Sequence, residues 1–132
     1  MATRPPPSSK PLTQRLHLKP GVRLLTVGLP ADVEAQLAGV ERTSRAPAEI
    51  ASVLLFAKNE AELTARFARA VDKLSADPLI WVCYPKGGSG VETDLNRERL
   101  WELLAPRALR PVAQIAVTDV WSALRFRRVG VA

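Results

Sequence analysis

Residues 79–90 read L-I-W-V-C-Y-P-K-G-G-S-G, an unbroken apolar run followed at once by a glycine-rich loop. A continuous apolar run of this length is typical of a strand that is covered on both faces of its sheet. I-A-S-V-L-L-F-A at 50–57 has the same character. Strands of this kind occur in parallel sheets with helices on both faces, so these two stretches decide the fold class.

The segment between the two strands has the periodicity of a helix. Apolar residues recur at helical spacing from residue 60 to about residue 75, which predicts one helical face packed on the sheet. Asn59 is placed to cap this helix, with Glu62 three residues on as in a capping box. Glu62 can also pair with Arg66 one turn later. Asp77-Pro78 is expected to end the helix, because a residue before proline avoids helical geometry.

A second long helix is expected after the glycine-rich loop. Thr93 or Asp94 would cap it, and it would run to about Ala105. The remaining predicted elements are a short helix or turn at 12–18, a turn at 19–21, a brief helix at 31–39, and strands at 22–27, 40–44, 112–117 and 120–127.

The end of the chain predicts a hairpin. Thr118-Asp119 is too short a turn for a parallel crossover, so the last two strands must be antiparallel. In the final strand Leu124 and Phe126 share one face, while Arg125 and Arg127 share the other. Alternating strands and helices therefore predict an α/β fold: a three-layer, Rossmann-like, mainly parallel sheet flanked by helices, with a C-terminal antiparallel hairpin.

Length and composition favour an ordinary globular protein. The chain has 132 residues, of which 47% are hydrophobic and 24% are charged, which suits one α/β domain over 12–132. Residues 1–11 hold four prolines and are expected to form a disordered tail. There is no apolar stretch near the roughly 18 residues that cross a bilayer, and no apolar core of a secretory signal. The expected location is cytoplasmic, without membrane contact.

The residue inventory argues against several kinds of active site. Cys83 is the one cysteine and His17 the one histidine, so neither a zinc site nor a Cys-His nucleophile pair is indicated. Cys83 falls in the middle of a buried strand and is expected to be unreactive. Trp81, Trp101 and Trp121 are interpreted as core or rim aromatics. The sequence requires no metal and no cofactor, and it contains no recognisable catalytic set.

The loop after the first predicted strand lacks the residues of a nucleotide site. In open α/β sheets, ligands bind beyond the carboxyl ends of the strands. A dinucleotide fingerprint there needs G-x-G-x-x-G, so that the backbone can approach the phosphates. The loop G-L-P-A-D has only Gly28, and Pro30 has no N–H to donate.

The loop P-K-G-G-S-G at 85–90 is the better candidate. Its glycines let backbone N–H groups turn toward a ligand, the lysine adds a positive charge, and the following helix points its positive end at the same space. The lysine precedes the glycines, so this is not a Walker A motif. The predicted binding residues are Lys86, Gly87, Gly88, Ser89, Gly90, Thr93 and Asp94. The alternative is a surface loop in which Asp94 only caps a helix.

Four motifs occur together: L-x-L-K-P-G at 16–21, W-V-C-Y-P-K at 81–86, S-G-V-x-T-D-L at 89–95 and W-S-A-L-R-F at 121–126. With them the chain, from about Pro11 to Val129, resembles the bacterial family called domain of unknown function 3052. This resemblance implies a small cytoplasmic bacterial protein and transfers no catalytic residue. More distantly, K-P-G before the first strand and the closing hairpin are similar to class I methyltransferases that use S-adenosylmethionine. The chain lacks the glycine-rich loop of those enzymes and an acidic residue at the end of a second strand. The resemblance therefore implies a degenerate relative.

Three functions follow as hypotheses. The pattern favours a non-enzymatic binding or regulatory domain that holds a small anionic ligand or an acidic protein at the Lys86 loop. One alternative is a group transferase with an atypical S-adenosylmethionine site. The other is a nucleic-acid-binding protein, because 19 Lys and Arg against 13 Asp and Glu give a net charge of +6. The basic residues are dispersed and aromatics make up only 5% of the chain, which gives that last alternative less support.

Overall fold

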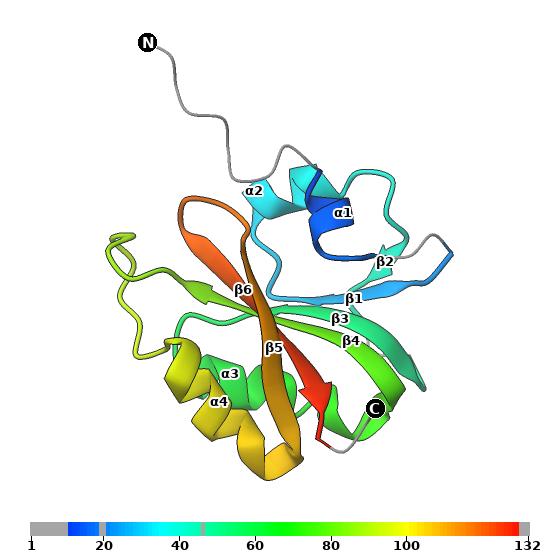
Figure 1. Cartoon of the computed structure of the whole chain (residues 1–132). Helices are drawn as coiled ribbons and strands as arrows, with labels where there is room; N and C mark the ends of the chain where they lie inside the picture. The colour runs from blue at the N-terminus through cyan, green and yellow to red at the C-terminus, as the bar shows by residue number, and fades with distance from the viewer. Residues whose placement is uncertain (1–10, 19–20, 46, 130–132) are drawn as a thin grey trace.

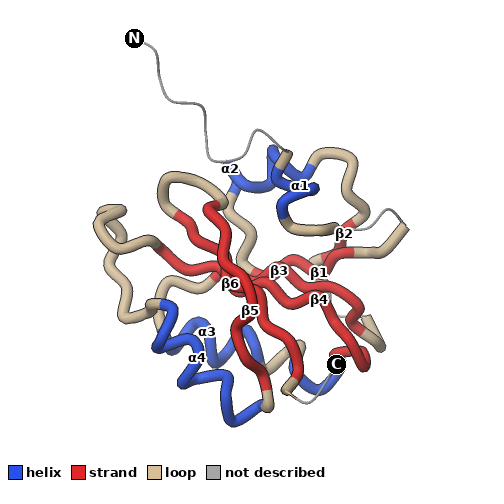
Figure 2. Tube along the Cα trace, viewed as in Figure 1, coloured by secondary structure: helices blue, strands red, loops and turns tan. Residues whose placement is uncertain are grey.

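A six-stranded sheet runs through the computed structural model, which describes residues 11–18, 21–45 and 47–129 (Figures 1 and 2). The strand order is β2-β1-β3-β4-β6-β5. Strands β2, β1, β3 and β4 are parallel, and β6 is antiparallel to both of its neighbours. The α/β class, the parallel sheet and the antiparallel hairpin are thus confirmed. The bounds are β1 (Leu24–Val27), β2 (Arg42–Thr43), β3 (Ile50–Phe56), β4 (Leu74–Pro85), β5 (Leu109–Ala116) and β6 (Trp121–Arg128).

Helices cover both faces of this sheet (Figure 1). On one face lie α3 (Glu60–Phe67) and α4 (Arg97–Leu104), and on the other lie α1 (Leu12–Arg15) and α2 (Ala31–Glu34). Single 3₁₀ turns follow α2, α3 and α4, at Ala35–Leu37, Val71–Lys73 and Ala105–Arg107.

The core is divided between the two faces because side chains alternate along each strand. In β4, Ile80 and Val82 belong to the cluster that includes the apolar residues of α3 and α4. Trp81 and Cys83 belong to the cluster on the α1 and α2 side. All four side chains are at most 1% exposed, which is the two-sided burial that the continuous apolar run predicted.

The predicted helix over 60–75 is too long. Helix α3 ends at Phe67, and Leu74 already belongs to β4. Strand β4 continues through Asp77-Pro78 because its pairing with β3 is irregular at that point: Ile50 faces Leu74, but Ser52 faces Leu79. A bulge of this kind accommodates a proline, which has no N–H for the ladder.

The predicted cap of the second helix is also wrong. Helix α4 begins at Arg97, and its N-cap is Asn96, whose Oδ1 accepts a hydrogen bond from the Arg99 N–H at 2.8 Å. Thr93 instead accepts the N–H of Leu95 at 3.0 Å through its hydroxyl, which forms a local turn. The segment after β4 therefore stays irregular for longer than the sequence suggested.

The three tryptophans have different environments. Trp81 is 1% exposed and donates its indole N–H to the Leu16 carbonyl at 2.9 Å, which ties the end of α1 to the sheet. Trp121 packs edge-on against Phe56 with ring centroids 5.1 Å apart. Trp101 is half exposed on α4. The predicted tail lies outside the described residues except for Pro11, and of the turn at 19–21 only Gly21 is described.

Candidate functional site at the carboxyl end of the sheet

Three loops meet where the parallel strands end: those after β1, β3 and β4. The loops after β3 and β4 are directly linked, since the Ala57 N–H donates to the Cys83 carbonyl at 3.1 Å. This is the edge where α/β proteins place ligands.

The backbone after β1 is covered by an arginine from α3. Gly28 has φ +69°, and a Cβ added to it would clash with Arg66 Nη1 and lie 2.9 Å from the Phe56 carbonyl. The same Nη1 donates to the Phe56 carbonyl at 2.6 Å and lies 3.7 Å from Glu62. The predicted Glu62–Arg66 pair is confirmed, and it holds a guanidinium where a cofactor would approach the glycine.

A polar hollow of about 530 Å³ lies beside this loop, at the carboxyl ends of β1 and β2. Arg42 and Glu34 form an ion pair of 3.1 Å in its wall. The Thr26 hydroxyl donates to the Thr43 carbonyl at 3.5 Å. The charged groups of the wall are thus already paired with each other.

The start of α3 is capped as the sequence predicted, with one difference. Asn59 Oδ1 accepts the Glu62 N–H at 2.8 Å. Glu62 reaches back as in a capping box, but it accepts the N–H of Lys58 at 2.8 Å, one residue before the cap.

Asp94 also serves α3, although the sequence predicted that it would serve the next helix or a ligand. Its Oδ1 accepts the Glu60 N–H at 2.9 Å. The Glu60 carboxylate in turn holds Arg99 through two hydrogen bonds of 2.6 and 2.7 Å. The hydrogen bond to Arg99 lowers the pKa of Glu60 below its usual value. Asp94, Glu60 and Arg99 therefore lock the loop after β4 onto the start of α3.

The Lys86 loop is an exposed turn. The Lys86 N–H donates to the Val120 carbonyl at 2.7 Å, and the Ser89 N–H donates to the Lys86 carbonyl at 3.2 Å. Ser89 Oγ accepts the Val91 N–H at 3.4 Å. Gly88 and Gly90 have φ of +80° and +88°, and a Cβ added to either would meet nothing within 4 Å. These glycines are needed for the turn itself and do not mark a close approach by another group.

The predicted site residues lie outside the four main hollows of the described part of the chain. None of these four hollows includes a residue from 86–94 in its lining. Ser89, Thr93 and Asp94 spend their side-chain oxygens on nearby backbone N–H groups. Lys86 is half-buried, and its ammonium makes no hydrogen bond or ion pair with the described residues.

Two buried groups near this edge have raised pKa values. Burial raises the pKa of the Cys83 thiol well above its usual value, so the thiolate is strongly disfavoured. Burial also raises the pKa of Tyr84, whose hydroxyl accepts a hydrogen bond from Gln114 at 3.0 Å. Among the described residues, no group of three or more His, Cys, Asp or Glu side chains could hold a metal ion.

Sequence reasoning missed the role of Arg66 and the ion pair of Glu60 with Arg99. The i,i+4 spacing indicated a surface pair for Arg66, but its contact with Gly28 joins residues from separate elements. Arg99 and Glu60 lie 39 positions apart, so no local pattern links them.

The comparisons with known proteins bear on the fold alone. No family model matches the chain, and no curated protein matches it. A variant of LepI in complex with SAH (S-adenosylhomocysteine) and a substrate analogue is similar at TM-score 0.54 and 18% identity. A pericyclic reaction enzyme is similar at TM-score 0.50 and 16% identity. Each match covers 89% of this chain and 39% of the other, so the chain spans about two fifths of the length of these proteins.

A methyltransferase-like protein from Pseudomonas syringae also resembles the chain, with a TM-score of 0.45 and 16% identity over 81% of this chain and 73% of the other. The first two matches show that the sheet and its helices follow the same α/β fold as those two proteins. In the described part of the chain, no helix is both long and apolar enough to cross a membrane.

Proposed function

We propose that the chain is a non-enzymatic binding or regulatory domain, which holds an anionic ligand or an acidic partner at the Lys86–Gly90 loop. The observation that carries this proposal is the distribution of paired charges at the carboxyl end of the sheet. Glu60, Arg66, Asp94 and Arg99 are all engaged with protein groups. Lys86 has no such partner among the described residues, so its charge is available to a ligand.

A second lysine strengthens the positive character of this edge. Lys58 follows β3 as Lys86 follows β4, and its exposed ammonium also makes no ion pair within the described residues. The two strands are hydrogen-bonded neighbours. Two cations on adjacent loops suit an acidic surface or a phosphate group, with an affinity that salt weakens.

The loop after β1, where proteins of this fold class usually hold a cofactor, supports the proposal that the domain is not an enzyme. The Arg66 guanidinium lies against Gly28, where a cofactor phosphate or carboxylate would need the backbone. Pro30 begins the next helix without an N–H to donate. The Cys83 thiol is fully buried.

Titration calorimetry tests the binding proposal. The probes are inorganic phosphate, a panel of nucleotides and phosphate esters, and a hexaglutamate peptide. Lys86→Ala is expected to weaken the best probe at least fivefold, and Lys58→Ala with Lys86→Ala is expected to weaken it further. Lys73→Ala removes an exposed lysine at the opposite end of β4 and is expected to change nothing. Equal binding by wild type and Lys86→Ala, or no binding by wild type, would contradict the proposal.

A second candidate is an atypical group transferase that uses S-adenosylmethionine, with Lys86, Ser89 and Asp94 near the substrate. It is favoured by the likeness to LepI, whose structure contains SAH, and by the hollow at the ends of β1 and β2. A thermal shift decides this: ligand at 100 times its dissociation constant adds about 2.7 kcal/mol of stability. The absence of a shift with millimolar S-adenosylmethionine and with SAH would exclude this candidate.

Several assignments remain part of the proposal. They are the three-layer Rossmann-like form, the single domain over 12–132, the likeness to domain of unknown function 3052, and the bacterial cytoplasm as location. Nucleic-acid binding through the net charge of +6 is the third candidate. This candidate predicts binding to nucleic acid in a gel-shift assay, with an affinity that falls steeply as the salt concentration rises. An affinity that does not change with salt would exclude it.

A further inference from the structure

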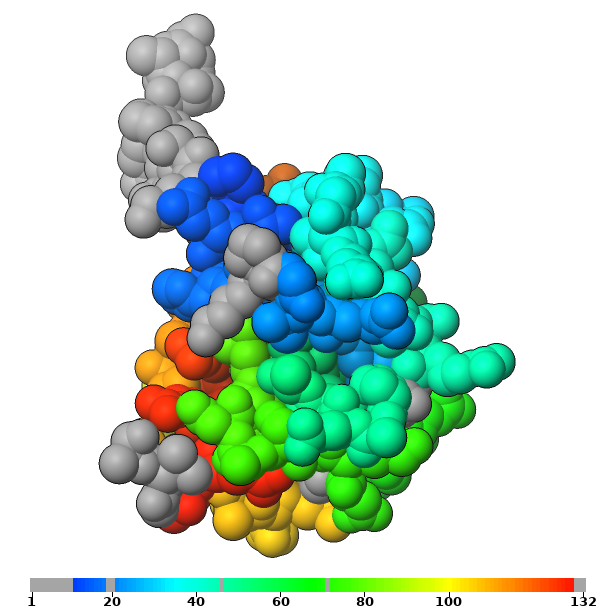
Figure 3. All heavy atoms as spheres, turned by 90° about the vertical axis from the view of Figure 1, so that its right-hand side faces the viewer, coloured from blue at the N-terminus to red at the C-terminus, as the bar shows by residue number. Residues whose placement is uncertain are grey.

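A separate hollow lies at the opposite end of the sheet, where the parallel strands begin. It has a volume of about 220 Å³. Figure 3 looks toward this end, where the segment before β1 and the first residues of β3 and β4 come together. The hollow lies on the α1 side of the sheet, because Arg125 in its wall pairs in register with Trp81, which packs with Leu12 and Leu16.

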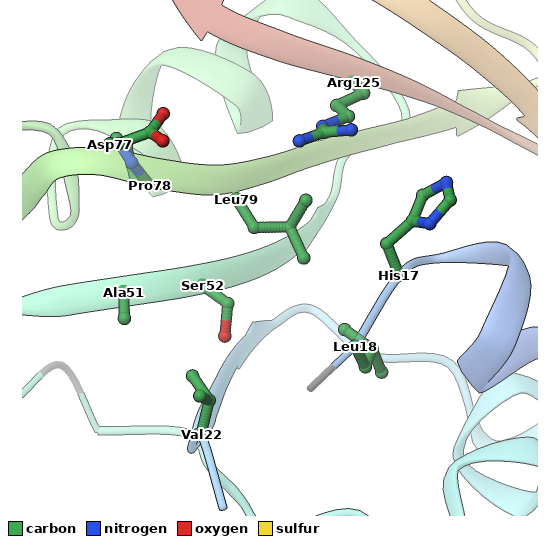
Figure 4. Close-up of a pocket in the computed structure, with 9 residues that line it drawn as sticks. All are labelled: His17, Leu18, Val22, Ala51, Ser52, Asp77, Pro78, Leu79 and Arg125. Atoms are coloured by element: carbon green, nitrogen blue, oxygen red, sulfur yellow. The ribbon is translucent and has the colours of Figure 1, made fainter. Parts of the chain in front are cut away.

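Arg125 is the unusual residue of this wall (Figure 4). It follows Trp121 and Ala123 on the same face of β6, and both of these are in the core. Its Nε atom is buried, with less than 1 Å² of exposed surface, and has no hydrogen-bond partner within the described chain. Buried polar atoms nearly always have a partner, and a guanidinium cannot lose its proton. The Nη groups of Arg125 are not among the buried atoms and also have no partner within the described chain, so the charge of this guanidinium is open to an anion in the hollow.

The other polar groups of the hollow leave this charge uncompensated. Asp77 bonds to Arg127 at 3.4 Å, and its side chain is 66% exposed. No ion pair within 4 Å joins Asp77 to Arg125 in the described structure. The Ser52 hydroxyl donates to the Arg23 carbonyl at 3.2 Å, so its proton is already used.

The rest of the wall is apolar except for His17. Leu18, Val22 and Leu79 face the hollow, and their side chains come from the segment before β1 and from β4 (Figure 4). A water molecule occupies roughly 30 Å³ in the liquid, so this volume suits an organic molecule of about six to ten heavy atoms.

We propose that this hollow binds a small organic monocarboxylate. The carboxylate accepts hydrogen bonds from the Nη groups of the Arg125 guanidinium, and a short apolar chain packs against Leu18, Val22 and Leu79. Guanidinium and carboxylate form strong, charge-assisted bonds of defined geometry. This inference is independent of the function proposed for the Lys86 loop, since the two sites lie at opposite ends of the strands.

Calorimetric titration of the full chain with acetate, butyrate and hexanoate tests the inference. Affinity is expected to rise roughly threefold per added methylene group, because each one buries apolar surface. Hexan-1-ol and hexylamine, which match the chain but lack the carboxylate, are expected to bind at least tenfold more weakly than hexanoate. Equal binding of hexanoate and hexan-1-ol would overturn the proposal, as would the absence of hexanoate binding up to 10 mM (about the limit of such titrations).

Two variants locate the site. Arg125→Gln removes the charge and is expected to weaken hexanoate at least tenfold, while Arg110→Gln removes an exposed arginine from the neighbouring strand and should leave binding unchanged. Val22→Phe fills the apolar side of the hollow without altering its charge, and is expected to abolish binding. Circular dichroism verifies that each variant is folded. Wild-type affinity in folded Arg125→Gln overturns the assignment; if that variant does not fold, wild-type affinity in Val22→Phe overturns it.

Discussion

Replacing Trp81 with phenylalanine tests whether the link between α1 and the sheet stabilises the fold. The Trp81 indole N–H donates to the Leu16 carbonyl at 2.9 Å, and both residues are at most 1% exposed. Phenylalanine fills much of the same space but cannot donate. The Leu16 carbonyl would then be buried without its partner, which costs about 1–3 kcal/mol.

Trp121→Phe is the matched control. Trp121 is 7% exposed and packs edge-on against Phe56, but its indole makes no hydrogen bond with the described residues. The smaller ring costs about 1–2 kcal/mol of packing at either position. Trp81→Phe is therefore expected to lose about 2–5 kcal/mol and Trp121→Phe about 1–2 kcal/mol.

Urea unfolding, followed by far-UV circular dichroism, measures the difference. With a slope of about 1–3 kcal/mol per molar urea, the midpoint of Trp81→Phe should lie roughly 0.3–3 M below that of Trp121→Phe. The slope should be the same for both variants, because both expose nearly the same surface on unfolding. Equal midpoints for the two variants would refute the idea that the hydrogen bond to Leu16 contributes to stability.

Three further predictions concern the carboxyl end of the sheet. Gly28→Ala should destabilise the fold by about 1–3 kcal/mol in urea unfolding, since the new Cβ would meet Arg66 and the residue would keep a positive φ. Glu60→Gln should destabilise the fold at pH 7 and much less at pH 3. The hydrogen bond to Arg99 lowers the pKa of Glu60 in the folded state. The stability that the Glu60 carboxylate contributes is therefore present above the ordinary pKa of about 4.5, and it is lost as the pH falls through the lower pKa of the folded state. Asn96→Ala should cost about 1 kcal/mol, the usual effect of losing an N-cap.

Each of these predictions has a control in the same region. Gly87→Ala adds a Cβ that meets nothing and needs no positive φ, so its stability should change by less than about 0.5 kcal/mol. Glu98→Gln removes an exposed carboxylate that makes no ion pair with the described residues. Its effect on stability should show no comparable pH dependence. A larger loss from Thr93→Ala than from Asn96→Ala would mean that the cap of α4 is assigned wrongly.

The sheet could be predicted from the sequence because its central strands are buried on both faces. The runs at 50–57 and 79–84 are apolar without interruption, and no amphipathic helix has that pattern. The hairpin followed from the length of its turn. The predicted helix over 60–75 was too long because Ala70 and Leu74 continue its apolar spacing. Both residues do pack on the core, but from the turn after α3 and from the start of β4.

The candidate site was harder to predict because it depends on contacts between distant residues. Lys86 and its glycines were correctly found at the end of a strand. The sequence could not show that Asp94 would bond to the start of α3, 34 positions earlier. Nor could it show that Arg125, predicted only to share a strand face with Arg127, lines a hollow formed by the segment before β1 and by residues of β3 and β4.

The position of β6 has a consequence for how the protein is made. This strand is the last in chain order but pairs with β4 inside the sheet. A ribosome must add the 36 residues from Lys86 to Trp121 before pairing can begin, which takes roughly 2–7 s at about 5–20 residues per second. Hairpin formation itself needs only about 1–10 μs. During those seconds the apolar edge of β4 can pair with another nascent chain, so the speed of translation sets the period in which newly made molecules are prone to aggregate.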